Sequence, residues 1–235
     1  MKLLAIETAT EACSVALWLD GEMRERFEIA PRGHAARILP WAEALLAGAG
    51  LARSALDAIA VGRGPGAFTG VRLAVAAGQG LALALDRPLI GVSSLAALAE
   101  ATVNAARVLA ALDARMGEVY IGAFERDDEG LVRALDAERV CAPGEVEAPP
   151  GSAWTAVGPG FAAVSGALVQ RLAGRLESVD ASALPHAAMV ARLAALGRGE
   201  ASDNPAVIEP AYLRQRVAQT LEEQRLGEKT APLGD

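Results

Sequence analysis

The pattern of apolar and charged residues at the N-terminal end of the chain predicts three β-strands. Leu3–Thr8 and Ala12–Leu19 are apolar runs, and Asp20-Gly21 after the second run is a strong hairpin turn signal. Glu22–Ile29 alternates charged and apolar side chains, as an edge strand does. A plain doubly wound fold begins with a strand, a helix and a strand, so three antiparallel strands at the start argue against it.

Helical spacing of apolar residues begins after this predicted hairpin. It predicts a helix from about His34 or Ile38 to Gly48, whose start stays open because Pro40 is tolerated only in a first turn or at a kink. Strands and helices then alternate, with Ser93 or Ser94 as the cap of the last helix. The expected elements are strands at Leu56–Val61 and Pro88–Val92, and helices at Val71–Leu85 and Ser93–Val103.

The same order of elements recurs in weaker form in the second half. The expected elements are strands at Arg107–Asp113, Glu118–Phe124, Leu131–Val140 and Trp154–Val157, and helices near Phe161–Gly174 and His186–Gly197. Two blocks of this kind predict two related α/β lobes, each with a mixed sheet flanked by helices. We place the first lobe at residues 1–104, the second at 105–218 and a frayed charged tail at 219–235.

Composition narrows the class of protein. The chain has 235 residues, a formal charge of −7 and two cysteines without Cys-x-x-Cys spacing, so we expect no autonomous nucleic-acid binding, no disulfide framework and no thiolate zinc site. The longest apolar run, Val71–Leu85, is shorter than the roughly 20 residues of a membrane span. Glu7 comes too early for a signal-peptide core, so we expect a cytoplasmic protein without membrane contact.

A glycine-rich segment precedes the most apolar predicted helix. Gly62–Ala67 formally matches G-x-G-x-x-A, the dinucleotide fingerprint, but the required acid should end the next strand, whereas Asp86 precedes it. Pro65 also lacks the N–H that such a loop offers to phosphate. No Gly-Lys-Ser/Thr follows, which excludes a P-loop. The remaining interpretation is a loop whose glycines permit tight turns.

The Val71–Leu85 helix has no predicted solvent face, because Arg72 and Gln79 are its only polar side chains. A helix that is apolar all round is buried on all sides, either within its lobe or partly against another chain. Ala74, Gly78 and Ala82 form a small-residue stripe that allows close helix approach. Both alternatives stay open on this pattern alone.

Catalytic signatures are sparse. The chain has two histidines, and the position four after His34 is Ile38, so the helical His-x-x-x-His pair of many metal sites is missing. No Gly-x-Ser-x-Gly elbow occurs. Glu7, Asp113 and Glu118 lie near predicted strand ends, where they could bind Mg²⁺ or serve as solvated or capping carboxylates.

Five segments form a recognisable set that spans nearly the whole chain: Ala5–Thr10, Val15–Leu17, Gly64–Arg72, Asp113–Tyr120 and Pro210–Arg214. In this order they resemble the TsaB family, bacterial subunits of the machinery that makes N6-threonylcarbamoyladenosine next to the anticodon of tRNA. The resemblance implies α/β architecture with two actin-like, sugar-kinase-like lobes of the ASKHA, ribonuclease H-like type. It implies no cofactor and no metal, since the catalytic paralogue TsaD has a His-x-x-x-His pair where this chain has His34 and Ile38.

The resemblance also implies partners and site residues. We expect a non-catalytic subunit that pairs with a TsaD-like paralogue through its first helices, is joined by a TsaE-like ATPase, can form a homodimer and meets tRNA only indirectly. The expected interface residues are His34, Ile38, Trp41, Leu45, Val71, Ala74, Gly78 and Leu81. The residues of a vestigial phosphate site are Glu7, Thr8, Thr10, Asp113 and Gly117. A nucleotide-dependent phosphotransferase or ATPase of the same fold is the alternative, followed by a metallopeptidase.

Overall fold

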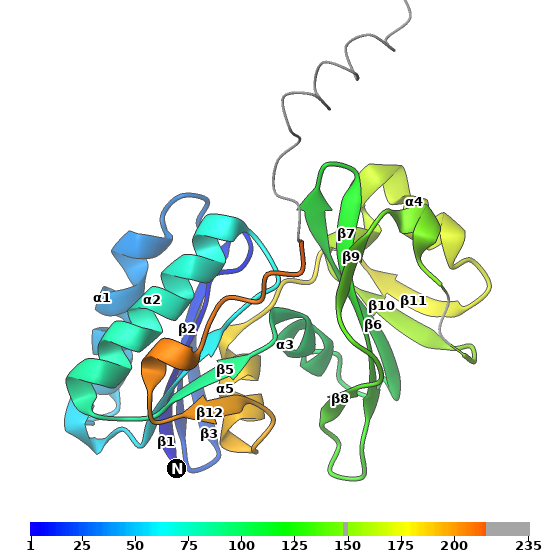
Figure 1. The fold of residues 1–235 in the computed structure, drawn as a ribbon. Helices are drawn as coiled ribbons and strands as arrows, with labels where there is room; N and C mark the ends of the chain where they lie inside the picture. Colours follow the sequence, from blue (N-terminus) through cyan, green and yellow to red (C-terminus); the bar gives the residue numbers. More distant parts are fainter. Residues whose placement is uncertain (148–149, 215–235) are drawn as a thin grey trace, which may run out of the picture.

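The computed structural model describes residues 1–147 and 150–214, and its ribbon forms two lobes side by side (Figure 1). The predicted tail at 219–235 lies outside the described residues. Each lobe is built on one mixed β-sheet, and the two sheets have related strand orders.

The first sheet contains the predicted N-terminal strands. Its strands, in spatial order, are β12 (Glu200–Ser202), β5 (Leu89–Val92), β4 (Ala58–Gly62), β1 (Lys2–Glu7), β2 (Ala12–Leu19) and β3 (Glu22–Ile29). Strands β1, β2 and β3 are antiparallel, whereas β4 is parallel to β1 and β5 to β4. The predicted hairpin turn is confirmed, since Asp20 and Gly21 both have positive φ, 50° and 107°.

The second sheet repeats this arrangement. Its strands, in spatial order, are β11 (Leu176–Asp180), β10 (Trp154–Val157), β6 (Arg107–Arg115), β7 (Glu118–Arg126) and β8 (Val132–Ala134), with β9 (Arg139–Cys141) also paired to β7. An antiparallel hairpin is again followed by parallel strands on its far side. The two related lobes are therefore confirmed, but the single strand expected at Leu131–Val140 is two short strands, β8 and β9.

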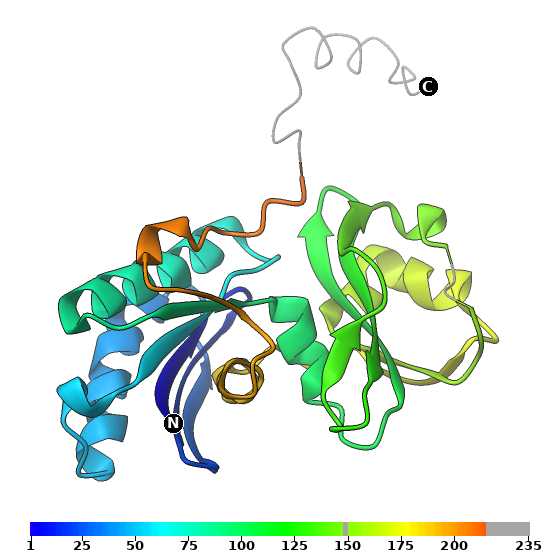
Figure 2. The same ribbon diagram turned by 60° about the horizontal axis from the view of Figure 1, so that its bottom comes forward.

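Helices alternate with the sheets in layers (Figures 1 and 2). The outer layer on the first sheet is α1 (His34–Gly48) and α2 (Phe68–Leu85), the central layer is α3 (Ser94–Glu100) and α5 (Ala187–Ala195), and the outer layer on the second sheet is α4 (Ala163–Arg171). Strand periodicity explains the layers, because alternate residues of β1 face opposite sides: Leu4 packs with α1 and α2, and Leu3 with the central helices.

The division of the chain between lobes differs from the expected one. Residues 105–218 were assigned to the second lobe, yet α5 packs on β1 and β2, and β12 pairs with β5. The backbone N–H of Ala187 donates to Ser14 Oγ at 2.8 Å, which fixes the start of α5 on the first sheet. The chain therefore returns to the first lobe, because the inner face of that sheet is apolar and needs a cover.

Most helix ends lie within a few residues of the prediction. Ser93 caps α3, with its Oγ accepting from the backbone N–H of Ala96 at 3.1 Å. Helix α2 begins at Phe68 and not at Val71. Helix α4 is shorter than predicted, since the chain near Phe161 forms the separate 3₁₀ turn Pro159–Phe161. The other 3₁₀ turns are Arg53–Ala55, Pro143–Glu145 and Pro205–Val207.

Candidate functional site

The small-residue stripe of α2 faces its own sheet. Ala74 is fully buried, and a β-carbon added to Gly78 would lie 2.3 Å from Val61 Cγ1 of β4. This contact means that only glycine allows the helix to approach the sheet so closely. The expectation that Ala74 and Gly78 contact a partner is corrected here: both serve the packing of α2 within the lobe.

The other residues expected at an interface divide into buried and half-buried sets. Those buried in the core of the first lobe are Ile38, Leu45 and Val71. Ile38 and Leu45 pack in the core of the first lobe, and Val71 is 4% exposed and lies against Gly64. They leave little surface for a partner, which corrects their assignment too. Those that keep some exposure are His34, Trp41 and Leu81.

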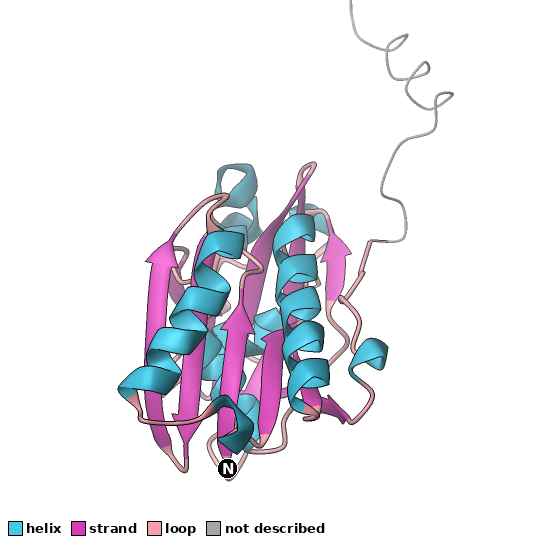
Figure 3. Ribbon diagram, turned by 90° about the vertical axis from the view of Figure 1, so that its left-hand side faces the viewer, coloured by secondary structure: helices cyan, strands magenta, loops and turns pink. Residues whose placement is uncertain are grey.

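An apolar surface does exist on the opposite side of the two helices. We define the outer face as the exposed residues Ala35, Ala36, Leu39, Pro40 and Ala47 of α1, and Phe68, Ala76, Gly80, Leu83 and Ala84 of α2. Leu83 is 77% exposed and Phe68 53%. The two helices lie side by side over the sheet (Figure 3). An exposed apolar surface of this kind is typical of an interaction site.

Helix α2 is also, among the residues that the structure describes, the one helix long and apolar enough to cross a membrane by length and composition. The core helices of globular proteins pass the same test. Here the Ala74–Gly78 side is packed tightly on β4, and one third of the helix is buried.

A cleft of about 740 Å³ lies between the lobes, next to the start of α2. Its walls include Phe68 of α2, Tyr120 of β7 and Tyr212 near the C-terminal end. Two of the five expected phosphate-site residues, Thr10 and Asp113, line it. Both are already engaged, because Thr10 Oγ1 accepts from the Ala12 N–H at 3.2 Å and Asp113 Oδ1 from the Arg115 N–H at 2.7 Å.

The other three expected residues lie elsewhere. Glu7 is 1% exposed, and its carboxylate accepts from the Ala9 N–H at 2.6 Å and from Ser94 Oγ at 2.7 Å. Burial raises the pKa of the Glu7 carboxyl above its ordinary value, although these hydrogen bonds oppose the rise. Thr8 is also buried, and Gly117 lies in the tight β6–β7 turn. The expected phosphate residues are therefore not gathered around one cavity.

The glycine-rich loop packs on the β1–β2 turn, which contains the expected phosphate-site residues Thr8 and Thr10. A β-carbon on Gly70 would lie 1.9 Å from the Thr8 carbonyl oxygen, and the Thr8 hydroxyl donates to the Gly70 carbonyl at 2.8 Å. The Ala67 N–H donates to the Ala9 carbonyl at 2.7 Å. The loop thus binds the strand turn directly and positions the first turn of α2.

A segment to which the sequence analysis assigned no helix or strand crosses between the lobes (Figure 1). We call residues 205–214 the C-terminal strap. Gln79 Nε2 of α2 donates to the carbonyls of Pro205 and Ile208 at 3.2 and 3.1 Å. At the far end of the strap, Arg214 donates to the Ala114 carbonyl at 3.0 Å and forms an ion pair with Glu118. The strap therefore joins α2 to the β6–β7 hairpin of the second lobe.

Arg72 and Gln79, the two polar side chains of the apolar stretch Val71–Leu85, both bond to this strap. Arg72 Nε donates to Tyr212 Oη at 2.7 Å, and the Arg72 guanidinium stacks 3.6 Å from the centre of the Phe68 ring. The only sequence signal for this role was the presence of two polar residues in an apolar helix. A polar side chain in such a place needs a hydrogen-bond partner.

The described part of the chain contains no group of three or more His, Cys, Asp or Glu residues placed to hold a metal ion. His34 and His186 lie apart: His34 lines the interlobe cleft, and His186 stacks on Phe27 with ring centres 4.2 Å apart. His186 Nδ1 lies 3.0 Å from Glu25 Oε2, which holds the start of α5 on β3.

Comparison with known proteins identifies the family. The family model of TsaD, tRNA N6-adenosine threonylcarbamoyltransferase, matches residues 28–221. The tRNA threonylcarbamoyladenosine biosynthesis protein TsaB of Escherichia coli strain K12 is 42% identical over 229 residues, which covers 93% of this chain and 96% of that protein. The chain belongs to the TsaB family.

Other relatives support the assignment to TsaB. The TsaB protein of Haemophilus influenzae is 40% identical over 92% of this chain and 95% of its own length. A crystal structure described as an uncharacterized protein with similarity to peptidase YEAZ from Pseudomonas aeruginosa superposes with a TM-score of 0.82. The two sequences are 46% identical, and the superposition covers 91% of this chain and 99% of the Pseudomonas aeruginosa chain. The family resemblance, the ASKHA-like fold and the role in tRNA threonylcarbamoyladenosine biosynthesis are thereby confirmed.

Proposed function

We propose that this chain is a non-catalytic subunit of the threonylcarbamoyladenosine machinery and that it binds a TsaD-like catalytic paralogue through the outer face of α1 and α2. The observation that carries the proposal is the exposed apolar surface of these helices, whose opposite sides are fully used in the core. Covering such a surface with a partner removes apolar area from water and favours association.

The state of the phosphate-site residues supports a non-catalytic role. A magnesium ligand must present its carboxylate to the cavity, but Glu7 is buried and its oxygens accept hydrogen bonds from Ala9 and Ser94. The β1–β2 turn is covered by the Gly64–Gly70 loop at Thr8 and Ala9. The hydrogen bonds of Glu7 and the packing of the loop on Thr8 and Ala9 both stabilise the start of α2. The residues expected to bind phosphate therefore support the partner surface instead.

The partner at the outer face is the TsaD-like paralogue, because the TsaD family model matches this chain. Two proteins of one fold carry similar helices, which can pack against each other. A homodimer through the same face is the competing outcome. A TsaE-like ATPase would join the assembled pair, and tRNA would be bound through the partner. The net charge of −7 is consistent with indirect tRNA contact.

The direct experiment is sedimentation of this chain alone, of the TsaD-like paralogue alone and of their mixture. A complex with one copy of each is expected, together with threonylcarbamoyladenosine formation only when both are present. No complex at micromolar concentrations would contradict the proposal. A homodimer that persists unchanged in the mixture would also contradict it, since the face would then belong to a second copy.

The phosphotransferase alternative rests on the interlobe cleft and is separable from this proposal. It requires measurable ATP affinity in the chain alone. Calorimetry with Mg²⁺–ATP should give no binding heat up to millimolar nucleotide, because Glu7 is buried and the Asp113 carboxylate and Thr10 hydroxyl already accept backbone hydrogen bonds. Saturable binding would favour the alternative.

A further inference from the structure

Arg72 is the one charged side chain on α2, and it lies next to the α2 residues of the outer face. It is exposed and follows the same side of the helix as Ala76, Gly80 and Leu83. The helix α1 carries two charged residues, and both have partners within the chain: Arg37 pairs with Glu28 at 2.7 Å and Glu43 with Arg53 at 2.5 Å. Across residues 1–147 and 150–214, no carboxylate lies within ion-pair distance of Arg72.

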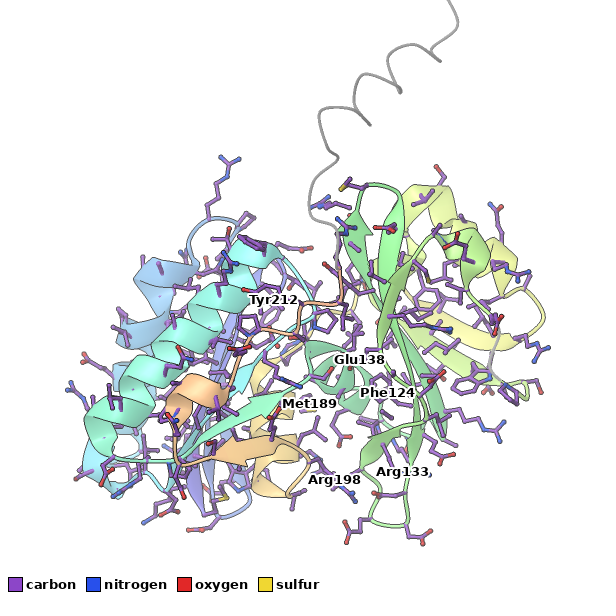
Figure 4. The ribbon with its side chains drawn as sticks, in the orientation of Figure 1. Phe124, Arg133, Glu138, Met189, Arg198 and Tyr212 are labelled. Atoms are coloured by element: carbon purple, nitrogen blue, oxygen red, sulfur yellow. The ribbon has the colours of Figure 1, made fainter. Side chains whose placement is uncertain are left out.

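The guanidinium of Arg72 is nevertheless held in one orientation. It stacks on the Phe68 ring at 3.6 Å, lies 5.4 Å from the centre of the Tyr212 ring and gives its Nε–H to Tyr212 Oη. Within the described part of the chain, these contacts use one of the five guanidinium N–H donors and leave the four on the two terminal nitrogens. Figure 4 labels Tyr212, which the C-terminal strap carries to the start of α2.

An oriented guanidinium that has no acid partner among the described residues has a consequence if the outer face is covered. A charge buried without a counter-charge is strongly unfavourable, and a carboxylate bound by two parallel N–H···O bonds offsets this cost with defined geometry. Lysine does not reproduce that geometry. The cluster of Phe68, Arg72 and Tyr212 is therefore built to accept a carboxylate at the edge of an apolar surface.

We infer that Arg72 is a specificity-determining residue that receives an aspartate or glutamate side chain of the docked partner. The inference rests on the proposed function, because it assigns one required contact within that interface. The strap takes part in recognition through Tyr212, which orients the guanidinium. The partner surface that fits is apolar, with one acidic side chain placed to meet the start of α2.

The test is titration of the TsaD-like paralogue with wild-type chain and with Arg72→Gln, Arg72→Lys and Tyr212→Phe, at low and high salt. Arg72→Gln should weaken binding at least about tenfold and reduce its salt dependence. Arg72→Lys should restore only part of the affinity, and Tyr212→Phe should weaken it about threefold. The matched control Arg133→Gln, which removes an exposed charge on β8, should bind like wild type.

The possible failures are distinguishable. If wild type and Arg72→Gln bind with equal affinity and equal salt dependence, the proposed contact between Arg72 and a partner carboxylate is wrong, while the proposed interface at the outer face is retained. If wild type does not bind at all, the proposed function is overturned together with the inference. Thermal unfolding of each variant measures any loss of stability, and Arg72→Gln should stay folded with only a small decrease in melting temperature, because the contacts it loses to Tyr212 and Phe68 are exposed.

Discussion

Gly78 of α2 lies against Val61 of β4 so closely that a single added β-carbon would approach Val61 Cγ1 to 2.3 Å. The next glycine along the helix, Gly80, has open space where its β-carbon would be. Two glycines two positions apart therefore have opposite roles. One fixes the distance between helix and sheet, and the other belongs to the outer face.

This contrast gives the first prediction. Gly78→Ala should lower the free energy of unfolding by about 1–3 kcal/mol, because the added methyl overpacks a core that cannot shift freely. Gly80→Ala should raise it by up to about 1 kcal/mol, since alanine is the better helix former and meets nothing. Urea denaturation of both variants measures the difference. Equal effects of the two substitutions would show that the helix does not sit on β4 as described.

Glu100 provides a second prediction because it joins elements from both lobes. Its buried carboxylate pairs with Arg126 of β7 at 3.1 Å and with Arg192 of α5 at 2.8 Å. Glu100→Gln should destabilise the protein by about 3 kcal/mol, since two guanidinium groups lose their counter-charge. The control Glu125→Gln breaks an exposed pair with Arg133 and should cost about 0–1 kcal/mol. Equal melting temperatures for the two variants would contradict the description of Glu100 as a buried link.

The raised pKa of Glu7 predicts a dependence of stability on pH. The folded protein holds this proton more tightly than the unfolded chain, so the stabilisation is complete below the ordinary glutamate pKa. It is lost as the pH rises through the folded pKa, with a slope of at most about 1.4 kcal/mol per pH unit. Glu7→Gln should flatten this part of the profile. Parallel profiles for the variant and wild type would show that Glu7 does not titrate as proposed.

Local patterns were sufficient to predict most elements of the fold. The Asp20-Gly21 turn, the strands around it and the repeated hairpin followed by alternating helices and strands were all predicted from residue periodicity and turn chemistry. The return of α5 to the first sheet was not predicted. Consecutive elements are usually neighbours in space, so the chain order favoured the second lobe. The contact that decides otherwise joins Ala187 to Ser14, far apart in sequence.

The candidate site was predicted less completely for a physical reason. Helical spacing shows that Ala74 and Gly78 share a face, but it does not show whether that face meets the sheet or a partner. The close approach of Gly78 to Val61 shows that this face of the helix packs on the sheet. The roles of Arg72 and Gln79 depend on the C-terminal strap, whose path has no periodic signal.

The most direct test of the proposed function changes one residue of the outer face. Leu83→Asp introduces a charge at a side chain that is 77% exposed, so the fold should be kept. Val103→Asp is the matched control, at an 81% exposed position outside the outer face. In sedimentation with the TsaD-like paralogue, Leu83→Asp should lose the complex and Val103→Asp should retain it. An unchanged complex with Leu83→Asp would contradict the assignment of the outer face as the partner surface.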